Sequence, residues 1–397
     1  MPFVEGHSVV RHFQLPCDEG CLEAWAREQR SVLKGPATMA LVFSGSGNNG
    51  RLDEILEIVR IYAQVPVVAG ASAVGLVANE RELENETGFS VALYHLPDTR
   101  AHSLHLPSDV FDRPDAGDVL CGLLGPLRER ANAWLLFASP ESLNSDAWLP
   151  AWDAATGGKP TVGGFASLDP AGPGTVLLCD GAVHAEGAVA LALEGGVTLD
   201  PIVAQGCRPV GDIWTVTEAE NNIIRQIGNR PILEVLRDTL EGMSRRDQQR
   251  ARGNIFIGVV HDEYKSSFRT GDFLVRNLAA IDPKSGAVAI ATPLRVGQNL
   301  QFQIRDARSA AANLERQLER KSLALLGQPV YGCCLANCIG RGGSLFGVPD
   351  HDASLIREAF PGLPLSGLFC NGEFGPVGGR TLLHGYAASL GLLVGKP

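Results

Sequence analysis

One unit of about 80 residues recurs three times along the chain, and this repetition limits the fold more than any other feature of the sequence. In each copy we predict, in order, a helix, a strand, a helix, a strand, a glycine-containing turn and a strand. Self-similarity of this kind indicates duplication of one structural unit. The predicted elements lie at residues 17–33, 39–43, 52–62, 65–70 and 88–93, then at residues 115–132, 133–138, 144–155, 159–164 and 186–193, and finally at residues 307–326, 330–336, 352–360, 363–369 and 387–394.

Two patterns support the repetition. The segments VPVVAGAS (65–72) and KPTVGGFAS (159–167) correspond to each other, and each is followed by a strand that ends in Val-Ala-Leu. In the helix at residues 52–62, apolar residues recur at i, i+3, i+4, i+7 and i+10, which is the spacing of one buried helical face.

The repeat pattern breaks between the second and third copies. Residues 200–211 contain proline and glycine and are interpreted as a domain boundary, and residues 217–243 are interpreted as largely helical. Four consecutive strands joined by turns follow, which predicts an antiparallel half. They lie at residues 255–260, 272–277, 287–291 and 300–305.

The fold class follows from the alternation of helices and strands. We predict an α/β protein with mixed (α+β) sheets covered by helices. A chain of 397 residues is too long for one ordinary core, so two related domains are expected, at residues 1–206 and 207–397. The first would contain two copies of the unit, and the second the antiparallel half and the third copy.

Composition excludes several classes of function. The formal net charge of −10 and the pI of 5.4 argue against partners such as nucleic acid or an anionic membrane, because both require a basic surface. No apolar run reaches the roughly 20 residues of a membrane span, and no leader pattern begins the chain, so a cytoplasmic protein is expected. The nine cysteines are then expected as thiols. Cys333, Cys334 and Cys338 lack the spacing of a zinc site, so no metal is predicted.

A glycine-rich stretch near the C-terminus is the first candidate binding site. Residues 367–380 contain five glycines, and glycine is needed where φ is positive or where a ligand approaches the backbone. No apolar pattern predicts burial of the polar side chains that accompany them, which are Cys370, Asn371, Glu373 and Arg380.

A second glycine-rich loop, CIGRGGSLFG at residues 338–347, follows a predicted strand of the third copy. Its backbone N–H groups would face a ligand, and Arg341 offers donors suited to a carboxylate or a phosphate. If the strands are parallel, this loop and residues 370–380 emerge at one sheet edge, where ligands of open α/β sheets bind. The alternative is that the glycines only form turns and that Arg341 pairs with Glu373 to hold the loops together. The sequence leaves both alternatives open.

Two other patterns are explained by helix capping. GSGNNG at residues 45–50 matches the glycine pattern of a dinucleotide-binding loop. Such a site also needs an acidic residue that binds the ribose, and residues 69–72 contain none. The favoured interpretation is therefore a loop in which Asn48 or Asn49 caps the next helix. Asp350 and Asp352 lie where a helix begins, and capping explains them too.

Catalysis has less support in the sequence. A cysteine-dependent enzyme would pair Cys338 or Cys370 with His351 or His384, but no local signature fixes their distance.

Several motifs occur together in a fixed order and resemble the FIST family, named for F-box and intracellular signal transduction proteins. In the second half they are GDFLVRN (271–277), VGQNLQFQIRDA (296–307), CIGRGGSLFG (338–347) and NGEFGPVGG (371–379). In the first half they are LVFSGSGNNGRLDEIL (41–56) and PVVAGASAVG (66–75). The resemblance covers nearly the whole chain, with a FIST N domain followed by a FIST C domain.

The resemblance implies a sensory protein that binds a small ligand, such as an amino acid or a related metabolite. We expect it to signal through a separate partner protein, because the chain offers no F-box, kinase or cyclase. Some bacterial members are similar to haem-binding nitric oxide sensors, which leaves a haem-dependent gas sensor open. Its axial ligand would be His261, His384 or Cys338. A cysteine-dependent enzyme is the second alternative.

The positions that match the family motifs are expected to form the ligand pocket. They are Arg276, Asn277, Arg305, Asp306, Cys338, Arg341, Cys370, Asn371 and Glu373. An arginine of this set would hold a carboxylate or a phosphate, and Glu373 or Asp306 would hold an amine. The alternative is a buried ion-pair network. Cys370 stands where the family pattern has glycine or alanine.

Overall fold

The structure is a computed structural model that describes residues 3–47, 50–84, 86–143, 145–167, 174–265, 267–268 and 271–396. The chain forms two compact units. The triplicate unit comprises Met1–Val203, Leu314–Leu383 and Ala387–Pro397, and the barrel unit comprises Ala204–Asn313 and His384–Tyr386. Most of the third copy thus packs in the same unit as the first two, although the barrel unit separates its first strand from the rest of it in the sequence. The division of the chain at residue 206 stays a prediction.

The three copies are present in the triplicate unit, and each begins with a strand and contains a two-stranded hairpin. The first copy contains β1 (Ser8–Phe13), α1 (Glu19–Val32), β2 (Met39–Ser44), α2 (Leu52–Tyr62), β3 (Val68–Ser72), β4 (Leu76–Ala78), β5 (Arg81–Leu83) and β6 (Phe89–Tyr94). The second contains β7 (Thr99–Leu106), η1 (Ser108–Val110), α3 (Ala116–Leu124), α4 (Leu127–Arg130), β8 (Ala131–Ala138), α5 (Leu149–Thr156), β9 (Thr161–Phe165), β10 (Leu177–Cys179), β11 (Ala182–His184) and β12 (Ala188–Gly195). The third contains β13 (Val197–Gln205), α8 (Ala307–Ala324), β21 (Val330–Cys338), α9 (Gly343–Phe346), α10 (His351–Ala359), β22 (Leu365–Cys370), β23 (Glu373–Val377), β24 (Arg380–His384) and β25 (Ala387–Gly395).

The same strand pairing occurs in every copy. The central strand pairs in parallel with the next long strand and antiparallel with the closing strand, as in β2 with β3 and β6. The corresponding strands are β8 with β9 and β12, and β21 with β22 and β25. The copies are therefore equivalent in topology as well as in sequence pattern.

The hairpins are exchanged between copies in a closed cycle. The hairpin β4–β5 of the first copy pairs with β22 of the third, β10–β11 of the second pairs with β3 of the first, and β23–β24 of the third pairs with β9 of the second. Three sheets of six strands result, each built from two copies. This exchange makes the triplicate unit one folding entity, because no copy completes its own sheet.

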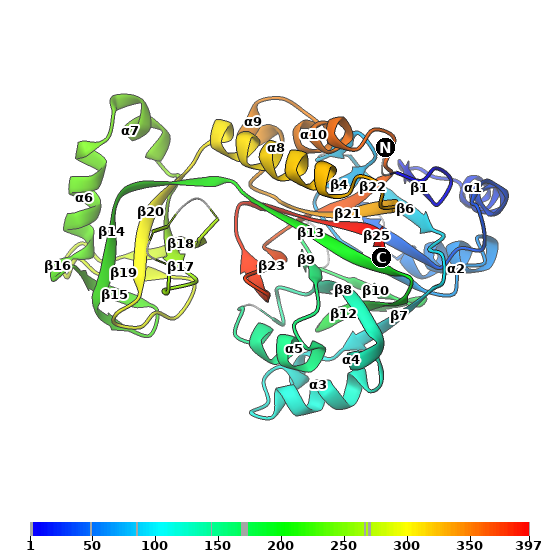
Figure 1. Ribbon diagram of the computed structural model, residues 1–397, viewed down its shortest axis with the longest axis horizontal. Helices are drawn as coiled ribbons and strands as arrows, with labels where there is room; N and C mark the ends of the chain where they lie inside the picture. Colours follow the sequence, from blue (N-terminus) through cyan, green and yellow to red (C-terminus); the bar gives the residue numbers. More distant parts are fainter. Residues whose placement is uncertain are drawn as a thin grey trace. The chain divides into compact units, whose positions relative to one another are not determined.

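The three sheets share one interior. Alternate residues of the central strands, such as Leu41, Leu135 and Cys334, lie in a common apolar core. Their neighbours face outward, and those of β2 and β8 pack under helices α1 and α2 and helices α3 and α5. Figure 1 shows the helices of the three copies outside the sheets. Strands covered on both faces contain nearly continuous apolar residues, which is why they were predicted correctly.

The glycine-rich loop predicted at residues 367–380 is not a loop. Most of these residues form the end of β22 and the hairpin β23–β24, whose turn contains Gly378 and Gly379 at positive φ angles of 61° and 77°. The prediction that no pattern buries its polar side chains was wrong for Cys370 and Glu373, which are 0% exposed. Both side chains are buried because the hairpin pairs with a sheet of another copy.

Gly164→Ala is expected to lower the free energy of unfolding by about 1–3 kcal/mol, the usual effect of overpacking. A methyl group at this position would lie 2.5 Å from Cys370 Sγ and 2.7 Å from the carbonyl oxygen of Gly372. Adding Cys370→Ala removes only the first clash, so the double variant should lose less stability than the sum of the two single variants. Urea unfolding of the four proteins measures this coupling. Gly117→Ala, with nothing within 4 Å of the new methyl group, is the control. Strict additivity would contradict the prediction.

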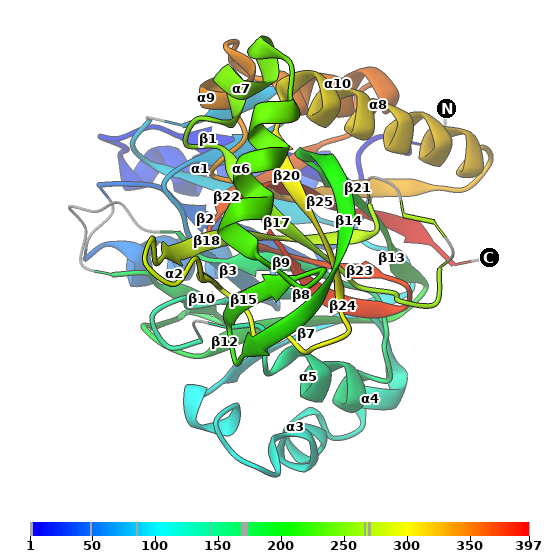
Figure 2. The same ribbon diagram turned by 90° about the vertical axis from the view of Figure 1, so that its left-hand side faces the viewer.

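The barrel unit is a closed ring of six strands, β14-β20-β17-β18-β19-β15, with β14 pairing back to β15. Val235 and Leu236 of helix α6 pack in the apolar core of this unit. The strands of the unit can be followed in Figure 2. The predicted antiparallel strands are confirmed. The elements are β14 (Cys207–Glu220), β15 (Ile223–Ile227), β16 (Arg230–Pro231), α6 (Ile232–Gly242), α7 (Arg245–Ala251), β17 (Ile255–Val260), β18 (Phe273–Ile281), β19 (Val288–Ile290) and β20 (Asn299–Arg305).

One prediction for this region was wrong, because residues 217–243 are not largely helical: β14 continues to Glu220 and β15 spans Ile223–Ile227. The boundary between the two units lies between Val203 and Ala204, inside the predicted stretch 200–211, although that stretch contains parts of β13 and β14. Val216, Ile224 and Ile227 are buried in the barrel core, and Ile224 and Ile227 lie three residues apart, a spacing that also fits a helix. Only the final part of the predicted helix, α6, is helical.

Candidate functional site

The carboxyl ends of β21 and β22 hold the candidate site. The two strands are parallel, as predicted, and Cys338 lies opposite Cys370 at their ends. The loop after β21 therefore begins beside the residues that lead into β23, and both predicted glycine-containing segments meet at this edge of the sheet.

Arg341, in the loop after β21, forms a fully buried ion pair with Asp352. Its Nε lies 2.6 Å from Asp352 Oδ2 and its Nη2 lies 3.0 Å from Oδ1, and both side chains are 0% exposed. Burial by itself would raise the pKa of Asp352, but Arg341 and the hydrogen bond with His351 hold it well below its usual range. The prediction that Asp352 caps a helix was wrong, because its carboxylate binds Arg341 instead.

The first copy contributes two acids to this loop. Glu84 Oε1 accepts a hydrogen bond of 2.7 Å from Gly343 N, and Glu82 Oε1 accepts one of 2.9 Å from Ala353 N. Asp350 is the N-cap residue of α10, as its place at a helix start predicted, but its Oδ1 accepts from Glu82 N at 2.6 Å and its side chain makes no capping hydrogen bond. The N–H of Gly343, which was expected to face a ligand, is thus occupied by Glu84.

Glu82→Gln is expected to remove a loss of stability at rising pH. Burial, followed by the charge of Asp352, raises the pKa of Glu82 to about 7 from an ordinary value of 4.5. The unfolded chain releases this proton at lower pH than the folded protein, so the native glutamate destabilises the fold increasingly between these two values. At about pH 8 the glutamine variant should be more stable than the wild type by an amount on the order of 1–3 kcal/mol, and near pH 4 it should not differ. Urea unfolding at both pH values measures this difference, and a difference independent of pH would contradict the prediction.

Glu373, the first residue of β23, is the second buried acid of the site. Its Oε2 accepts a hydrogen bond of 3.0 Å from Ala387 N, whereas its Oε1 has no partner among the described residues. Burial raises the pKa of Glu373 to about 8, although the Ala387 N–H, the Cys338 thiol and Arg341 all act to lower it. The predicted pairing partner of Arg341 was Glu373, but the carboxylate that binds Arg341 directly belongs to Asp352.

The exchanged hairpins show what occupies the position of Glu373 in the other copies. In each copy a carbonyl oxygen just before the first hairpin strand accepts a hydrogen bond of 2.9 Å from the neighbouring sheet, namely that of Gly75, Val176 or Gly372. The next residue is Leu76 in the first copy, Leu177 in the second and Glu373 in the third, and all three are buried. A leucine therefore suffices for packing at this position, and the carboxyl group of the third copy requires another explanation.

Two further polar groups of the site have no hydrogen-bond partner among the described residues. Arg341 Nη1 is one, although its guanidinium group lies 5.3 Å from the ring centroid of Phe346. The other is the side-chain amide of Asn337, which is 0% exposed and precedes Cys338 in β21. Most buried polar groups in proteins are hydrogen-bonded, so such a concentration marks a region of function or of bound solvent.

The remaining predicted residues of this edge differ in character. Burial, then the charge of Glu373, raises the pKa of the Cys370 thiol well above its usual value, which makes it a weak nucleophile. Asn371 lies on the surface, and its backbone N–H donates to Phe165 O at 3.2 Å. The thiol of Cys338 accepts from Gly340 N at 3.4 Å.

The barrel unit holds the other four predicted residues. Asp306 Oδ1 accepts from Ser309 N in the first turn of α8, and Oδ2 pairs with Arg250 at 2.6 Å and Arg208 at 3.5 Å. Only the carboxylate of this network is buried, because the side chains of Arg208 and Arg250 are partly exposed. The other three residues contact neighbours within the barrel unit. Arg276 Nη1 donates to Val275 O, and Asn277 accepts from Tyr386 Oη. Arg305 lies 5.8 Å from the centroid of the Tyr386 ring. Their contact with a ligand stays a prediction.

Sequence reasoning missed Glu82, Glu84 and Asn337. The two glutamates lie in the first copy, more than 250 residues before their partners in the third. The glycine at position 342 was the one sign in the sequence of a close neighbour. Its φ is 70°, and the Cβ of any other residue there would lie 2.7 Å from the Glu84 carboxylate.

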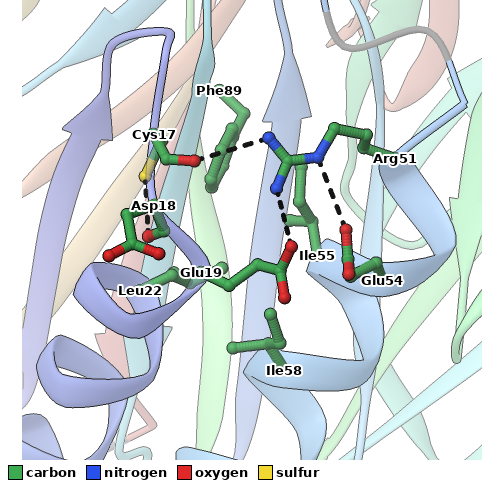
Figure 3. Close-up of a pocket in the computed structure, with 9 residues that line it drawn as sticks. All are labelled: Cys17, Asp18, Glu19, Leu22, Arg51, Glu54, Ile55, Ile58 and Phe89. Carbon is green, nitrogen blue, oxygen red and sulfur yellow. Dashed lines mark hydrogen bonds and ion pairs between the residues drawn. The ribbon is translucent and has the colours of Figure 1, made fainter.

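A separate cleft lies between the N-terminal ends of α1 and α2 (Figure 3). It contains about 230 Å³ of empty space, part of it open to solvent. Arg51 crosses it and pairs with Glu19 at 3.2 Å and Glu54 at 3.4 Å. Asp18, which also lines the cleft, accepts a hydrogen bond of 3.2 Å from Gly20 N, and no predicted site residue lines the cleft. The predicted cap at Asn48 or Asn49 lies outside the described residues.

The residues proposed for haem do not all suit it. Cys338 is packed between Cys370, Arg341 and Glu373, so an axial thiolate there would face a buried carboxyl group. Haem coordination by His261 or His384 stays a prediction. Among the described residues, no three His, Cys, Asp or Glu side chains are arranged to hold a metal ion. None of the described helices combines the length and apolar content needed to cross a bilayer.

Comparison with known proteins agrees with the resemblance seen in the sequence. An uncharacterised protein of Mycobacterium tuberculosis is 35% identical over 372 residues, which cover 94% of this chain and 95% of the relative. A Mycobacterium bovis protein, also uncharacterised, is 35% identical, with coverage of 93% and 94%. A crystal structure of chorismatase aligns over 98% of both chains with 9% identity and a TM-score of 0.35. Residues 38–230 match the FIST N domain and residues 233–376 match the FIST C domain, and the chain therefore belongs to the FIST family.

Proposed function

We propose that this FIST protein is a cytoplasmic sensor that binds a small molecule at the carboxyl ends of β21 and β22, with Arg341 and Glu373 as its principal contacts. The observation that carries the proposal is that each of these buried side chains has one polar atom without a partner among the described residues, Arg341 Nη1 and Glu373 Oε1.

The energetic argument concerns these unpaired atoms. Leaving a buried donor or acceptor unsatisfied costs about 1–3 kcal/mol, and more for a charged group. Because leucine occupies the position of Glu373 in the other two copies, the fold does not require a carboxyl group there. A ligand that supplies the missing hydrogen bonds would explain why the third copy departs from the other two.

The output of such a sensor would pass through a separate signalling protein. An amino acid or a related metabolite is the ligand class that the family resemblance suggests. A haem-dependent gas sensor and a cysteine-dependent enzyme are the competing functions. The raised pKa of Cys370 argues against the enzyme, because a thiolate is the reactive form.

The test is native mass spectrometry and absorption spectroscopy of the protein purified from its own cytosol. We expect a bound, non-chromophoric small molecule, or a metabolite in a thermal-shift screen that raises the melting temperature. The same ligand should be lost from a Glu373→Leu variant and kept by Glu194→Gln, which changes a carboxylate in β12. A Soret band would favour the gas sensor instead. A ligand that Glu373→Leu binds as well as the wild type would contradict the proposed site.

A further inference from the structure

Resting on the proposed function, we infer that the ligand group held by Arg341 and Glu373 is an uncharged carbonyl oxygen, as in an amide, which accepts one hydrogen bond from Arg341 Nη1 and one from a protonated Glu373 Oε1. This differs from the sequence-based expectation of a carboxylate at the arginine and an amine at the glutamate. Three properties of the site support it.

The first property is the position of the proton on Glu373. Oε2 already accepts the N–H of Ala387, so the proton of the neutral acid resides on Oε1, the oxygen that has no partner. Burial keeps this acid mostly protonated at neutral pH. At that pH Oε1 therefore carries the O–H and can donate a hydrogen bond.

The second property is the number of donors still available on Arg341. A guanidinium group has five N–H donors and no acceptor. Nε and Nη2 are used by Asp352, and Nη1 is buried without a partner. The unsatisfied atoms of Arg341 and Glu373 are thus both donors at neutral pH, and a group that satisfies both must accept hydrogen bonds.

The third property is the charge around these donors. The charge of Arg341 is balanced by Asp352 in a bidentate pair. Glu84 binds the same loop through Gly343, and Glu82 binds the first turn of α10. The other titratable groups that face Glu373 are the thiols of Cys338 and Cys370. An anionic ligand would add an uncompensated buried charge to this set, whereas a neutral carbonyl adds none.

An ammonium group fits less well for a related reason. It would need Glu373 to lose its proton first, and it would leave Arg341 Nη1 unsatisfied unless a second ligand group reached it. A zwitterionic amino acid could supply both groups, so it is the alternative that the experiment must distinguish.

Four small probes of similar size separate these ligand classes. They are propionamide, propionate, propylamine and alanine, tested up to their solubility by ligand-observed NMR and by thermal shift. The proteins are the wild type, Glu373→Leu and Glu373→Gln. Propionamide is expected to bind the wild type and not Glu373→Leu, and propionate should bind at least tenfold more weakly than propionamide.

The pH dependence gives the sharper result. If Glu373 must be protonated to donate, affinity for propionamide is constant below the pKa of about 8 and falls about tenfold by about pH 9. Glutamine at position 373 is a donor at every pH. It should therefore restore the binding that leucine removes, and its affinity should not change between these pH values.

The opposite pattern would overturn the inference. If alanine or propylamine binds more tightly as pH rises toward 8 and Glu373→Gln abolishes that binding, Glu373 accepts from an amine; the inference then fails while the proposed function stands. Preferential binding of propionate would also overturn the inference and leave the function intact. If no probe binds in a Glu373-dependent manner, the inference fails, and if the ligand screen also finds no Glu373-dependent ligand, the proposed function fails with it.

Discussion

Replacing Arg341 by alanine is expected to lower the free energy of unfolding by about 3–5 kcal/mol, because the carboxylate of Asp352 would remain buried without its counter-ion. The pair is completely buried, and its two N–O distances are 2.6 and 3.0 Å. Urea unfolding of the wild type and the variant at neutral pH measures the difference. Arg357→Ala, which removes an exposed arginine from α10, is the control and should change stability little.

A double replacement tests the physical reason. Arg341→Met combined with Asp352→Leu removes both charges and keeps apolar volume, and buried ion pairs replaced in this way are often neutral in stability. The double variant should therefore recover most of the stability lost by Arg341→Ala. A double variant as unstable as the single one would show that the loss arises from packing and not from the unpaired charge.

This expected effect limits what Arg341 can reveal about ligand binding. A variant that unfolds easily also loses affinity for any ligand, so the loss of binding by Arg341→Ala would not identify a contact. Glu373 is the better probe, because the other two copies of the unit show that its position accepts an apolar side chain.

Glu373→Leu is expected to abolish ligand binding and to leave the free energy of unfolding within about 1 kcal/mol of the wild type. The change removes a buried, unsatisfied oxygen, which stabilises the fold, and it leaves the N–H of Ala387 without its acceptor, which destabilises it by a similar amount, about 1–3 kcal/mol. Leu76 and Leu177 show that the side chain fits the equivalent positions. Ligand titration and urea unfolding of the same preparation measure both effects.

Two results would contradict this prediction. A fall of several kcal/mol would mean that Glu373 holds the sheets together, which is the structural alternative. Unchanged binding with unchanged stability would mean that the ligand contacts other residues, and the predicted residues of the barrel unit, such as Arg276 and Arg305, would become the next candidates. Glu194→Gln serves as the control in both measurements. It changes a carboxylate of β12 that lies opposite Ala131, the first residue of β8.

Local elements were predicted well wherever burial imposes a simple period. Helix α2 has its predicted bounds, and the central strands β2, β8 and β21 lie where compact apolar runs occur. The prediction failed at β14 and β15, where residues 217–227 were taken for helix. These two strands bury few residues, at irregular spacing, and their sequence pattern is therefore weak.

The candidate site was predicted in part. Cys338, Arg341, Cys370 and Glu373 do converge at one edge of the sheet, because the parallel strands of one βαβ unit end on the same side. Their partners were not predictable. Asp352 resembles a capping residue in sequence, and Glu82 and Glu84 belong to another copy.

The sequence alone determined the elements of each copy, their threefold recurrence and the family, since these depend on hydrophobic period, turn residues and motif order within short stretches of chain. Only the tertiary structure decided that the hairpins are exchanged, that Glu373 occupies a leucine position and that Arg341 is neutralised by Asp352. The physical reason is that these features arise from contacts between segments far apart in the chain, and burial and electrostatic shifts depend on all the groups that surround a residue in space.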